Sequence, residues 1–342
     1  MGNRSVELYH KMPNGSLRCD VCARRCILKD GQVGFCGIRK NENGRIKLLA
    51  YGKVESLGID PIEKKPVLHA FPNSDILSIS TTGCNFACQY CQNWDLSQRR
   101  KVSGTDMTPE EVVELALKYG CKGIAYTYNE PTIFLEYARD IGLLARKKGL
   151  INIFVTNGYE TPEAVEVLGD FLDFATVDFK GNGNNEFYRR YVSVTSAEPI
   201  FETIKGMLNK NIHVEITDLV VPKIGDNLDD AKSMILRLKD IAGKDLPISF
   251  LRFHPDYKLL DLPETSLSTL EKHYNLAKSL GMKYVYLGNV FGDERQNTFC
   301  PNCGKVVVRR NAFSTVEVNL TEDSKCKYCG YSIPFILASK PN

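Results

Sequence analysis

Short apolar runs alternate with amphipathic stretches along the middle of the chain. Between Asp75 and Leu287, runs rich in β-branched and aromatic residues are each followed by a stretch with apolar residues at helical spacing. This alternation is typical of βα units, and a series of such units predicts a parallel sheet. The predicted strands are 76–80, 123–128, 152–156, 174–179, 213–221, 248–253 and 284–287.

Helices are predicted between these strands, and three of them begin at a proline. Pro109, Pro162 and Pro199 follow Thr108, Thr161 and Glu198. Proline is favoured at the first helical position because the missing N–H has no partner there. The sequence predicts a helix starting at Thr108 and others at 131–147, 162–171, 199–209, 228–242 and 266–280.

The number of βα units decides the fold class within α/β proteins. A closed TIM barrel needs eight units, and the chain supplies six or seven, so we expect a partial, open TIM-like barrel. In such sheets the chemistry lies on loops at the carboxyl ends of the strands. We expect a Cys-rich N-terminal segment at 1–74, the partial barrel at 75–296 and a cysteine-containing C-terminal domain at 297–342.

Charge and hydropathy exclude some classes of partner. The chain of 342 residues has 44 Lys and Arg against 41 Asp and Glu, a net charge of +3. This balance argues against nucleic acid and acidic membranes as partners. No apolar run reaches the roughly 18 residues of a membrane span, and Met1 to Ser5 lead into polar sequence. We therefore expect a soluble, cytoplasmic protein.

The twelve cysteines are grouped rather than scattered. Eleven fall in three clusters whose close spacing is typical of metal ligands in a reducing compartment rather than of disulfides. The exception, Cys121, lies between a predicted helix and a predicted strand, where a buried inert thiol is expected.

The central cluster follows the first strand directly. Cys84, Cys88 and Cys91 form a C-x3-C-x2-C motif with Tyr90 before the last cysteine. Three thiolates on a 4Fe-4S cluster leave one iron open, and an open iron can chelate the amino and carboxylate groups of S-adenosylmethionine (SAM). A zinc knuckle or buried thiols are the alternatives. The spacing resembles that of the radical SAM superfamily, in which Tyr90 would lie near the adenine.

Polar residues end several of the following strands. Asn129 and Glu130 follow the second strand, and Thr156 and Asn157 end the third. Alternation along the fourth strand places Asp178 and Lys180 on one face. His254 follows the sixth strand. Taken singly, these could be a helix entry, a turn, a surface ion pair and a cap.

Together with the cysteine triplet, these motifs resemble the SAM-binding motifs of glycyl-radical activating enzymes. The resemblance implies roles for each residue. Glu130, with Asn129, would bind the amino group of SAM, although Tyr-Asn-Glu replaces the usual Gly-Gly-Glu. Thr156 and Asn157 would lie beside SAM, Lys180 near its carboxylate or sulfonium, Asp178 near a cation and His254 near the ribose.

A tighter resemblance covers most of the chain. Cys91–Trp94, Tyr128–Pro131, Val177–Lys180 and Tyr284–Val290 are similar to the radical SAM component of the AmmeMemoRadiSam group, itself similar to pyruvate formate-lyase activating enzyme. This implies an oxidoreductase that cleaves SAM reductively and abstracts hydrogen from a substrate carbon. The reductant would be a protein such as ferredoxin or flavodoxin. The substrate would be a partner protein that receives a glycyl radical, another protein, or a small molecule.

Two cysteine clusters flank the barrel. Cys19, Cys22, Cys26 and Cys36 could hold zinc or an auxiliary iron-sulfur cluster, and the spacing does not choose between them. Cys300, Cys303, Cys326 and Cys329 form two C-x2-C pairs, each followed by glycine, the pattern of a zinc ribbon or rubredoxin-like fold. A structural zinc is expected there, with iron as the alternative.

A different class of function remains open from the sequence. Three cysteine clusters would also suit an iron-sulfur or zinc protein that transfers electrons or acts as an adaptor without cleaving SAM. The polar residues at consecutive strand ends favour the enzyme, because an adaptor has no use for them.

Overall fold

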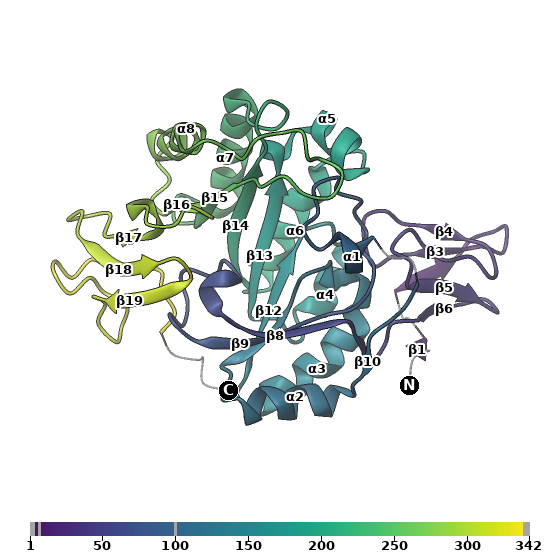
Figure 1. Cartoon of the computed structure of the whole chain (residues 1–342). Helices are drawn as coiled ribbons and strands as arrows, with labels where there is room; N and C mark the ends of the chain where they lie inside the picture. Colours follow the sequence, from purple (N-terminus) through teal and green to yellow (C-terminus); the bar gives the residue numbers. More distant parts are fainter. Residues whose placement is uncertain (1–3, 6–7, 99–100, 338–342) are drawn as a thin grey trace.

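An open eight-stranded sheet forms the centre of the molecule (Figure 1). The computed structural model describes residues 4–5, 8–98 and 101–337. Seven strands run parallel and β8 pairs antiparallel with β9 at one edge. In spatial order the strands are β16 (Val285–Gly288), β15 (Ile248–Arg252), β14 (His213–Val220), β13 (Phe174–Lys180), β12 (Ile151–Thr156), β11 (Gly123–Tyr126), β9 (Asp75–Ser80) and β8 (Ser56–Pro61).

The predicted α/β partial barrel is confirmed. Each of the seven predicted strands overlaps a parallel strand of the sheet. The sheet ends at β8 and β16, and these two edge strands do not pair with each other among the described strands. The barrel is therefore open, as the shortage of βα units indicated.

Helices follow the strands as βα units require. They are α2 (Pro109–Lys118), α3 (Leu135–Lys147), α4 (Pro162–Leu168), α6 (Glu198–Asn209), α7 (Leu228–Ala242) and α8 (Leu267–Ser279), with the short α1 (Trp94–Ser97) and α5 (Asn185–Phe187). Thr108 closes a capping box with Glu111 at the start of α2. The predicted helix 131–147 is divided, because a 3-10 turn at Pro131–Phe134 precedes α3.

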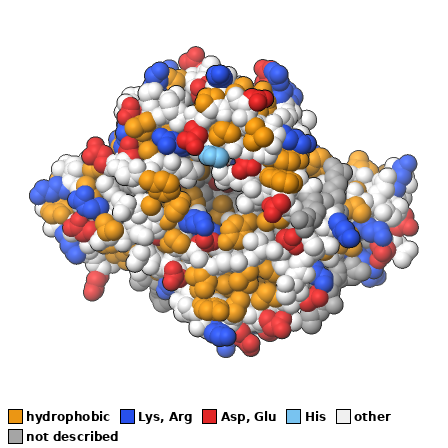
Figure 2. All heavy atoms as spheres, viewed as in Figure 1, with side chains coloured by type: hydrophobic (Ala, Val, Ile, Leu, Met, Phe, Trp, Pro, Cys, Tyr) orange, Lys and Arg blue, Asp and Glu red, His pale blue; other side chains and the backbone are white. Residues whose placement is uncertain are grey.

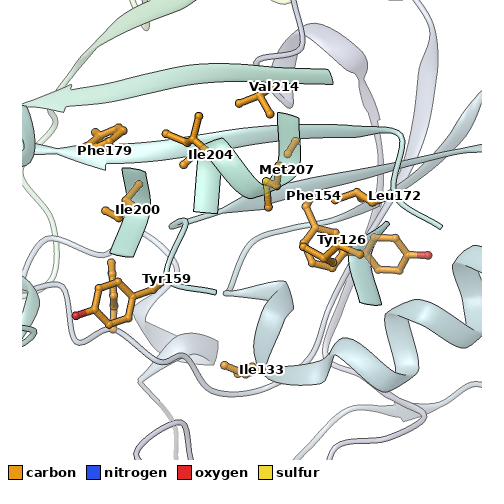
Figure 3. Packing of buried hydrophobic residues seen from close by; sticks show 14 of the residues in the cluster. Tyr126, Ile133, Phe154, Tyr159, Leu172, Phe179, Ile200, Ile204, Met207 and Val214 are labelled. Atoms are coloured by element: carbon orange, nitrogen blue, oxygen red, sulfur yellow. The ribbon is translucent and has the colours of Figure 1, made fainter. Parts of the chain in front are cut away.

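The core lies between the sheet and the helices that cover its outer face. Ile200, Ile204 and Met207 share one face of α6 and pack beside Phe179 and Val214 of the sheet (Figure 3). These five side chains are buried. The outer face of β13 and β14 is thus apolar, which leaves the opposite face of these strands for polar side chains.

Two small β units lie at either side of the barrel (Figure 1). The N-terminal unit contains two three-stranded sheets. The strands β7 and β10 form a separate, short antiparallel pair. The C-terminal one is a single antiparallel sheet. Their strands are β1 (Arg4–Ser5), β2 (Tyr9–Lys11), β3 (Leu17–Cys19), β4 (Ile27–Leu28), β5 (Arg39–Glu42), β6 (Arg45–Leu48), β7 (Lys53–Val54), β10 (Thr105–Asp106), β17 (Thr298–Phe299), β18 (Val306–Asn311) and β19 (Ser314–Val318).

The C-terminal unit has a small core of its own. Val307, Val308 and Phe335 are buried there and pack with Tyr284 and Tyr286 at the edge of the barrel sheet. Within the described part of the chain, no helix has the length and apolar character needed to cross a membrane.

Candidate active site

One cavity gathers the residues that the sequence singled out. It has a volume of about 250 Å³ and lies at the carboxyl ends of the parallel strands. Figure 2 shows the surface hollowed near the middle of the face viewed. The lining includes every residue expected to hold the cluster or SAM: Cys84, Cys88, Cys91, Tyr90, Asn129, Glu130, Thr156, Asn157, Asp178, Lys180 and His254.

The cysteine triplet lies on the loop that connects β9 to α1. Cys88 is buried, and burial raises the pKa of its thiol to about 12. Burial also raises the pKa of Cys84 and Cys91. The Sγ atom of Cys91 lies 3.2 Å from the Ser97 hydroxyl. These thiols are therefore protonated at neutral pH until a metal centre displaces the protons.

The lining also fits an ammonium and a carboxylate group. Asn129 donates its amide to the backbone carbonyl of Gly83 at 2.8 Å, which leaves its buried Oδ1 without a partner among the described residues. Lys180 lines the same cavity and carries a positive charge. A buried acceptor without a partner and a partly buried cation are the complement of an amino acid head group.

Glu130 lies on the loop after β11 and is held by three donors. Its Oε1 accepts from the Thr132 N–H at 3.0 Å and from the Thr156 hydroxyl at 2.8 Å. Its Oε2 accepts from the Asn157 N–H at 2.8 Å. These bonds explain why 131–134 forms a separate turn, because the Glu130 side chain caps it. They fix the carboxylate beside the cavity.

A second buried carboxyl group, Glu160, contacts the same hydroxyl groups. Its Oε1 lies 2.7 Å from Thr156 Oγ1 and 2.8 Å from Thr132 Oγ1. Burial, and then the charge of Glu130, raise the pKa of Glu160 to about 8. Glu160 was not predicted as a site residue. The only indication in the sequence is an acidic residue three positions after Asn157 and just before a helix start. At neutral pH the two carboxyl groups share one negative charge.

This arrangement predicts a pH-dependent stability. Glu160 keeps a proton in the folded chain that it loses near pH 4.5 when unfolded, so the free energy of unfolding falls as the pH rises from about 4.5 to 8. Glu160→Gln removes this contribution. The unfolding free energy of the variant relative to wild type should therefore rise across this window by up to about 1.4 kcal/mol per pH unit. Thermal midpoints of the two proteins, measured at several pH values, report this change.

Glu163→Gln is the matched control for that measurement. Glu163 lies three residues away and pairs with Arg25 at 2.9 Å, and this partner lowers the pKa of its carboxyl group. The group is ionised in both the folded and unfolded chain above pH 6, so its variant should show a constant offset. Equal pH profiles for the two variants would contradict the shared proton.

Asp178 and Lys180 face the cavity together, as alternation along β13 predicted. Lys180 Nζ lies 4.0 Å from Asp178 Oδ2, and the Thr217 hydroxyl donates to Asp178. Burial raises the pKa of Asp178. Burial would lower the pKa of Lys180, but the negative charges of Asp178 and of a Cys88 thiolate raise it above its usual value. Lys180 is thus a charged group between the carboxylate and the cysteine triplet.

Tyr90 and His254 lie at opposite extremes of exposure. Tyr90 is buried with its ring centroid 5.9 Å from that of Phe187 and 6.1 Å from that of Phe253. The His254 side chain is 60% exposed, with Nε2 3.6 Å from Glu264 Oε1. His254 therefore lies at the rim. The lining also includes residues that were not predicted to bind the cluster or SAM, among them Phe86, Gln92, Asn93, Ser97, Thr217, Arg252 and Asn289.

A second cavity of about 480 Å³ adjoins the first. Both are lined by Tyr128, Asn129 and Asp178, and the second extends to Arg310 and Phe313 of the C-terminal unit. The C-terminal unit thus forms a wall of the space beside the site.

The C-terminal cysteines form a compact candidate metal site. Cys300 Sγ lies 3.6 Å from Cys329 Sγ, and Cys303 Sγ lies 3.8 Å from Cys326 Sγ. All four sulfur atoms lie within 4.8 Å of one another. Zinc-sulfur bonds of about 2.3 Å place tetrahedral thiolates about 3.8 Å apart. The spacing therefore fits a single tetrahedral ion.

The fold and the site define an α/β protein with an open barrel and a three-cysteine loop in its central cavity. A family model described as the radical SAM superfamily matches residues 78–238. An uncharacterized protein of Methanocaldococcus jannaschii, MJ0808, is 44% identical over 98% of this chain and 100% of that protein. Residues 78–238 of the chain therefore form a radical SAM domain.

Two further comparisons are more distant. A protein of the same organism, MJ1632, provisionally named a glycyl-radical enzyme activating enzyme, is 26% identical over 62% of this chain and 79% of its own. A domain of pyruvate-formate lyase-activating enzyme from Bacteroides vulgatus is 15% identical, covers 49% of this chain and 99% of that domain, and gives a TM-score of 0.42.

Proposed function

We propose that this chain is a radical SAM enzyme of the AmmeMemoRadiSam type that cleaves SAM reductively and abstracts hydrogen from a substrate. The observation that supports this most is the single cavity in which the cysteine triplet meets polar residues from four strand ends. When bound, a 4Fe-4S cluster and SAM would supply a 5'-deoxyadenosyl radical by one-electron cleavage of the sulfonium.

The residues of the chain would bind and orient SAM. Cys84, Cys88 and Cys91 would hold three irons. Glu130 and the unpartnered Oδ1 of Asn129 would accept hydrogen bonds from the amino group. Lys180 would pair with the SAM carboxylate.

The remaining cavity residues would bind the nucleoside part of SAM and complete the site. The apolar pocket around Tyr90 would receive the adenine, and His254 at the rim would reach the ribose. Asp178 would keep Lys180 charged. Thr156 and Asn157 would hold Glu130 in place.

The second cavity would hold the substrate. It adjoins the SAM site, and its wall includes Lys65 and Arg310 beside Glu63. This polar lining suits a polar small molecule or a segment of a partner protein. The activase version of the function, in which a glycine of a partner protein receives the radical, is one form of this proposal, with a ferredoxin or flavodoxin as the electron donor.

The test is SAM cleavage by the iron-loaded protein under anaerobic conditions. With dithionite and SAM, equal amounts of 5'-deoxyadenosine and methionine should form, and protein without iron should form neither. A fully loaded protein that binds SAM without cleaving it would contradict the proposal and favour the adaptor. A glycyl radical detected by electron paramagnetic resonance (EPR) on a candidate partner would support the activase version, and turnover of a metabolite without a partner would exclude it.

A further inference from the structure

The four N-terminal cysteines surround one small enclosed cavity. Cys19 ends β3, Cys26 precedes β4, and the Cys19 N–H donates to the Cys26 carbonyl at 2.9 Å. Cys22 lies on the turn between them, and Cys36 comes from the loop before β5. The thiol-bearing residues lie together in the wall of this cavity, with Arg24, Arg39 and Asn85 beside them.

The sulfur spacing distinguishes this site from the C-terminal one. Among the described residues, only the C-terminal cysteines form a group of three or more ligands with all ligand atoms within 4.8 Å of one another. No three of the N-terminal sulfurs are that close, although the four residues line the same cavity. Thiolates on one zinc ion lie about 3.8 Å apart. The N-terminal thiols therefore line a shared space without the close sulfur-sulfur spacing of a single zinc ion. This wider spacing suits an iron-sulfur cluster, whose thiolates bind different iron atoms.

The wall of this cavity touches the loop of the central triplet. Gly83, directly before Cys84, has a φ of +89°, and a Cβ on it would lie 2.1 Å from the Cys36 carbonyl oxygen. Asn85, directly after Cys84, lines the N-terminal cavity. The backbones that carry Cys36 and Cys84 are thus in direct contact, so centres bound at the two sites would be neighbours.

Two arginine side chains lie beside the N-terminal cysteines, whose thiolates would be negatively charged. Arg24 donates to the backbone carbonyls of Asn85 and Ser193 and has no carboxylate partner among the described residues. Arg39 is 3% exposed, pairs with Glu136 at 2.7 Å and donates to the Ile133 carbonyl at 2.8 Å. Both line the cavity. A buried cation compensates the charge of a thiolate-bound cluster and tunes its reduction potential.

We propose that Cys19, Cys22, Cys26 and Cys36 bind a second 4Fe-4S cluster that passes single electrons to the cluster at Cys84, Cys88 and Cys91. A low-potential one-electron donor protein of the ferredoxin class reduces the N-terminal cluster. The cluster gives this electron to its neighbour, and each SAM cleaved consumes one electron. The relay rests on the proposed SAM cleavage, whereas the presence of the second cluster does not.

The first test removes the three cysteines of the central triplet and measures the iron and sulfide that the chain still binds. The full chain carrying Cys84→Ala, Cys88→Ala and Cys91→Ala is reconstituted with iron and sulfide beside the wild type. We expect about half of the wild-type iron and sulfide, with the visible absorption and reduced-state EPR signal of a 4Fe-4S cluster. Zinc in place of iron, or no metal at the N-terminal site, would overturn the proposal.

The second test measures proximity and electron flow. When both clusters of the wild type are reduced, their EPR signals should be split or broadened by spin coupling, and neither the triple variant nor Cys26→Ala should show this. Cys26→Ala should bind SAM with unchanged affinity, yet cleave it at least tenfold more slowly with a ferredoxin-class donor. If Cys26→Ala does not fold, wild type and the triple variant still decide the coupling.

The outcomes separate the two proposals. A wild type that holds both clusters and does not cleave SAM would overturn the proposed function and leave the second cluster standing. A triple variant without iron, beside a wild type that cleaves SAM, would overturn the second cluster alone. Uncoupled EPR signals from two reduced clusters would overturn the relay.

Discussion

Cys88→Ala is expected to reduce 5'-deoxyadenosine formation to the level of protein without iron. Cys88 is the most buried of the three cysteines in the central triplet and lines the cavity with Lys180. Three thiolates would hold a 4Fe-4S cluster with one iron left open, and the loss of one of them would leave the cluster too few protein ligands to persist. The measurement is 5'-deoxyadenosine released per chain, together with iron bound per chain, under anaerobic conditions.

Cys121→Ala makes the same chemical change at a buried cysteine outside the three clusters. Cys121 is 4% exposed and lies between α2 and β11. Its loss should cost at most about 1–2 kcal/mol of stability and leave both iron content and SAM cleavage near wild type. If Cys88→Ala and Cys121→Ala were equally active, the central triplet would not be the catalytic cluster site.

The strands could be predicted because their signal is local. β13 shows this clearly, since Val177 and Phe179 face the core while Asp178 and Lys180 line the cavity. Alternation along one strand fixes this pattern without knowledge of any neighbour. The open sheet followed from counting such units, and the carboxyl-end rule then brought residues from different strands into one site.

The features that the sequence did not reveal depend on contacts between distant segments. Glu160 belongs to the site because Thr132 and Thr156 bring it to Glu130, and no periodicity indicates such contacts. The contact between Gly83 and Cys36 joins segments far apart in the chain. For the same reason, the spacing of the N-terminal cysteines in the sequence does not identify the metal that they would bind. The distances between their sulfur atoms depend on the fold.

The C-terminal unit should lose its ordered structure when a cysteine of its candidate metal site is removed. Its buried core is small, and Cys300 and Cys326 are part of that core. For small domains of this kind, zinc binding supplies about 10–16 kcal/mol of apparent folding free energy. Cys326→Ala should therefore abolish zinc binding and remove hydrogen-exchange protection from residues 298–337, while the iron content of the barrel stays unchanged.

Val316→Ala is the control within the same unit. Val316 is 58% exposed on β19, so its truncation should change stability by no more than about 0.5 kcal/mol and leave zinc and exchange protection unchanged. Persistent protection of 298–337 in metal-free Cys326→Ala would show that packing alone folds the unit.

Loss of the C-terminal fold should also disrupt the second cavity, because Arg310 and Phe313 form part of the cavity wall. Arg310 is buried and donates to the Leu68 and Gln296 carbonyls, so unfolding would open the cavity to water. Cys326→Ala should then keep cleaving SAM without substrate, since the cluster site is separate, but lose coupling of that cleavage to any substrate in the second cavity. Equal loss of both activities would instead show that the C-terminal unit supports the barrel itself.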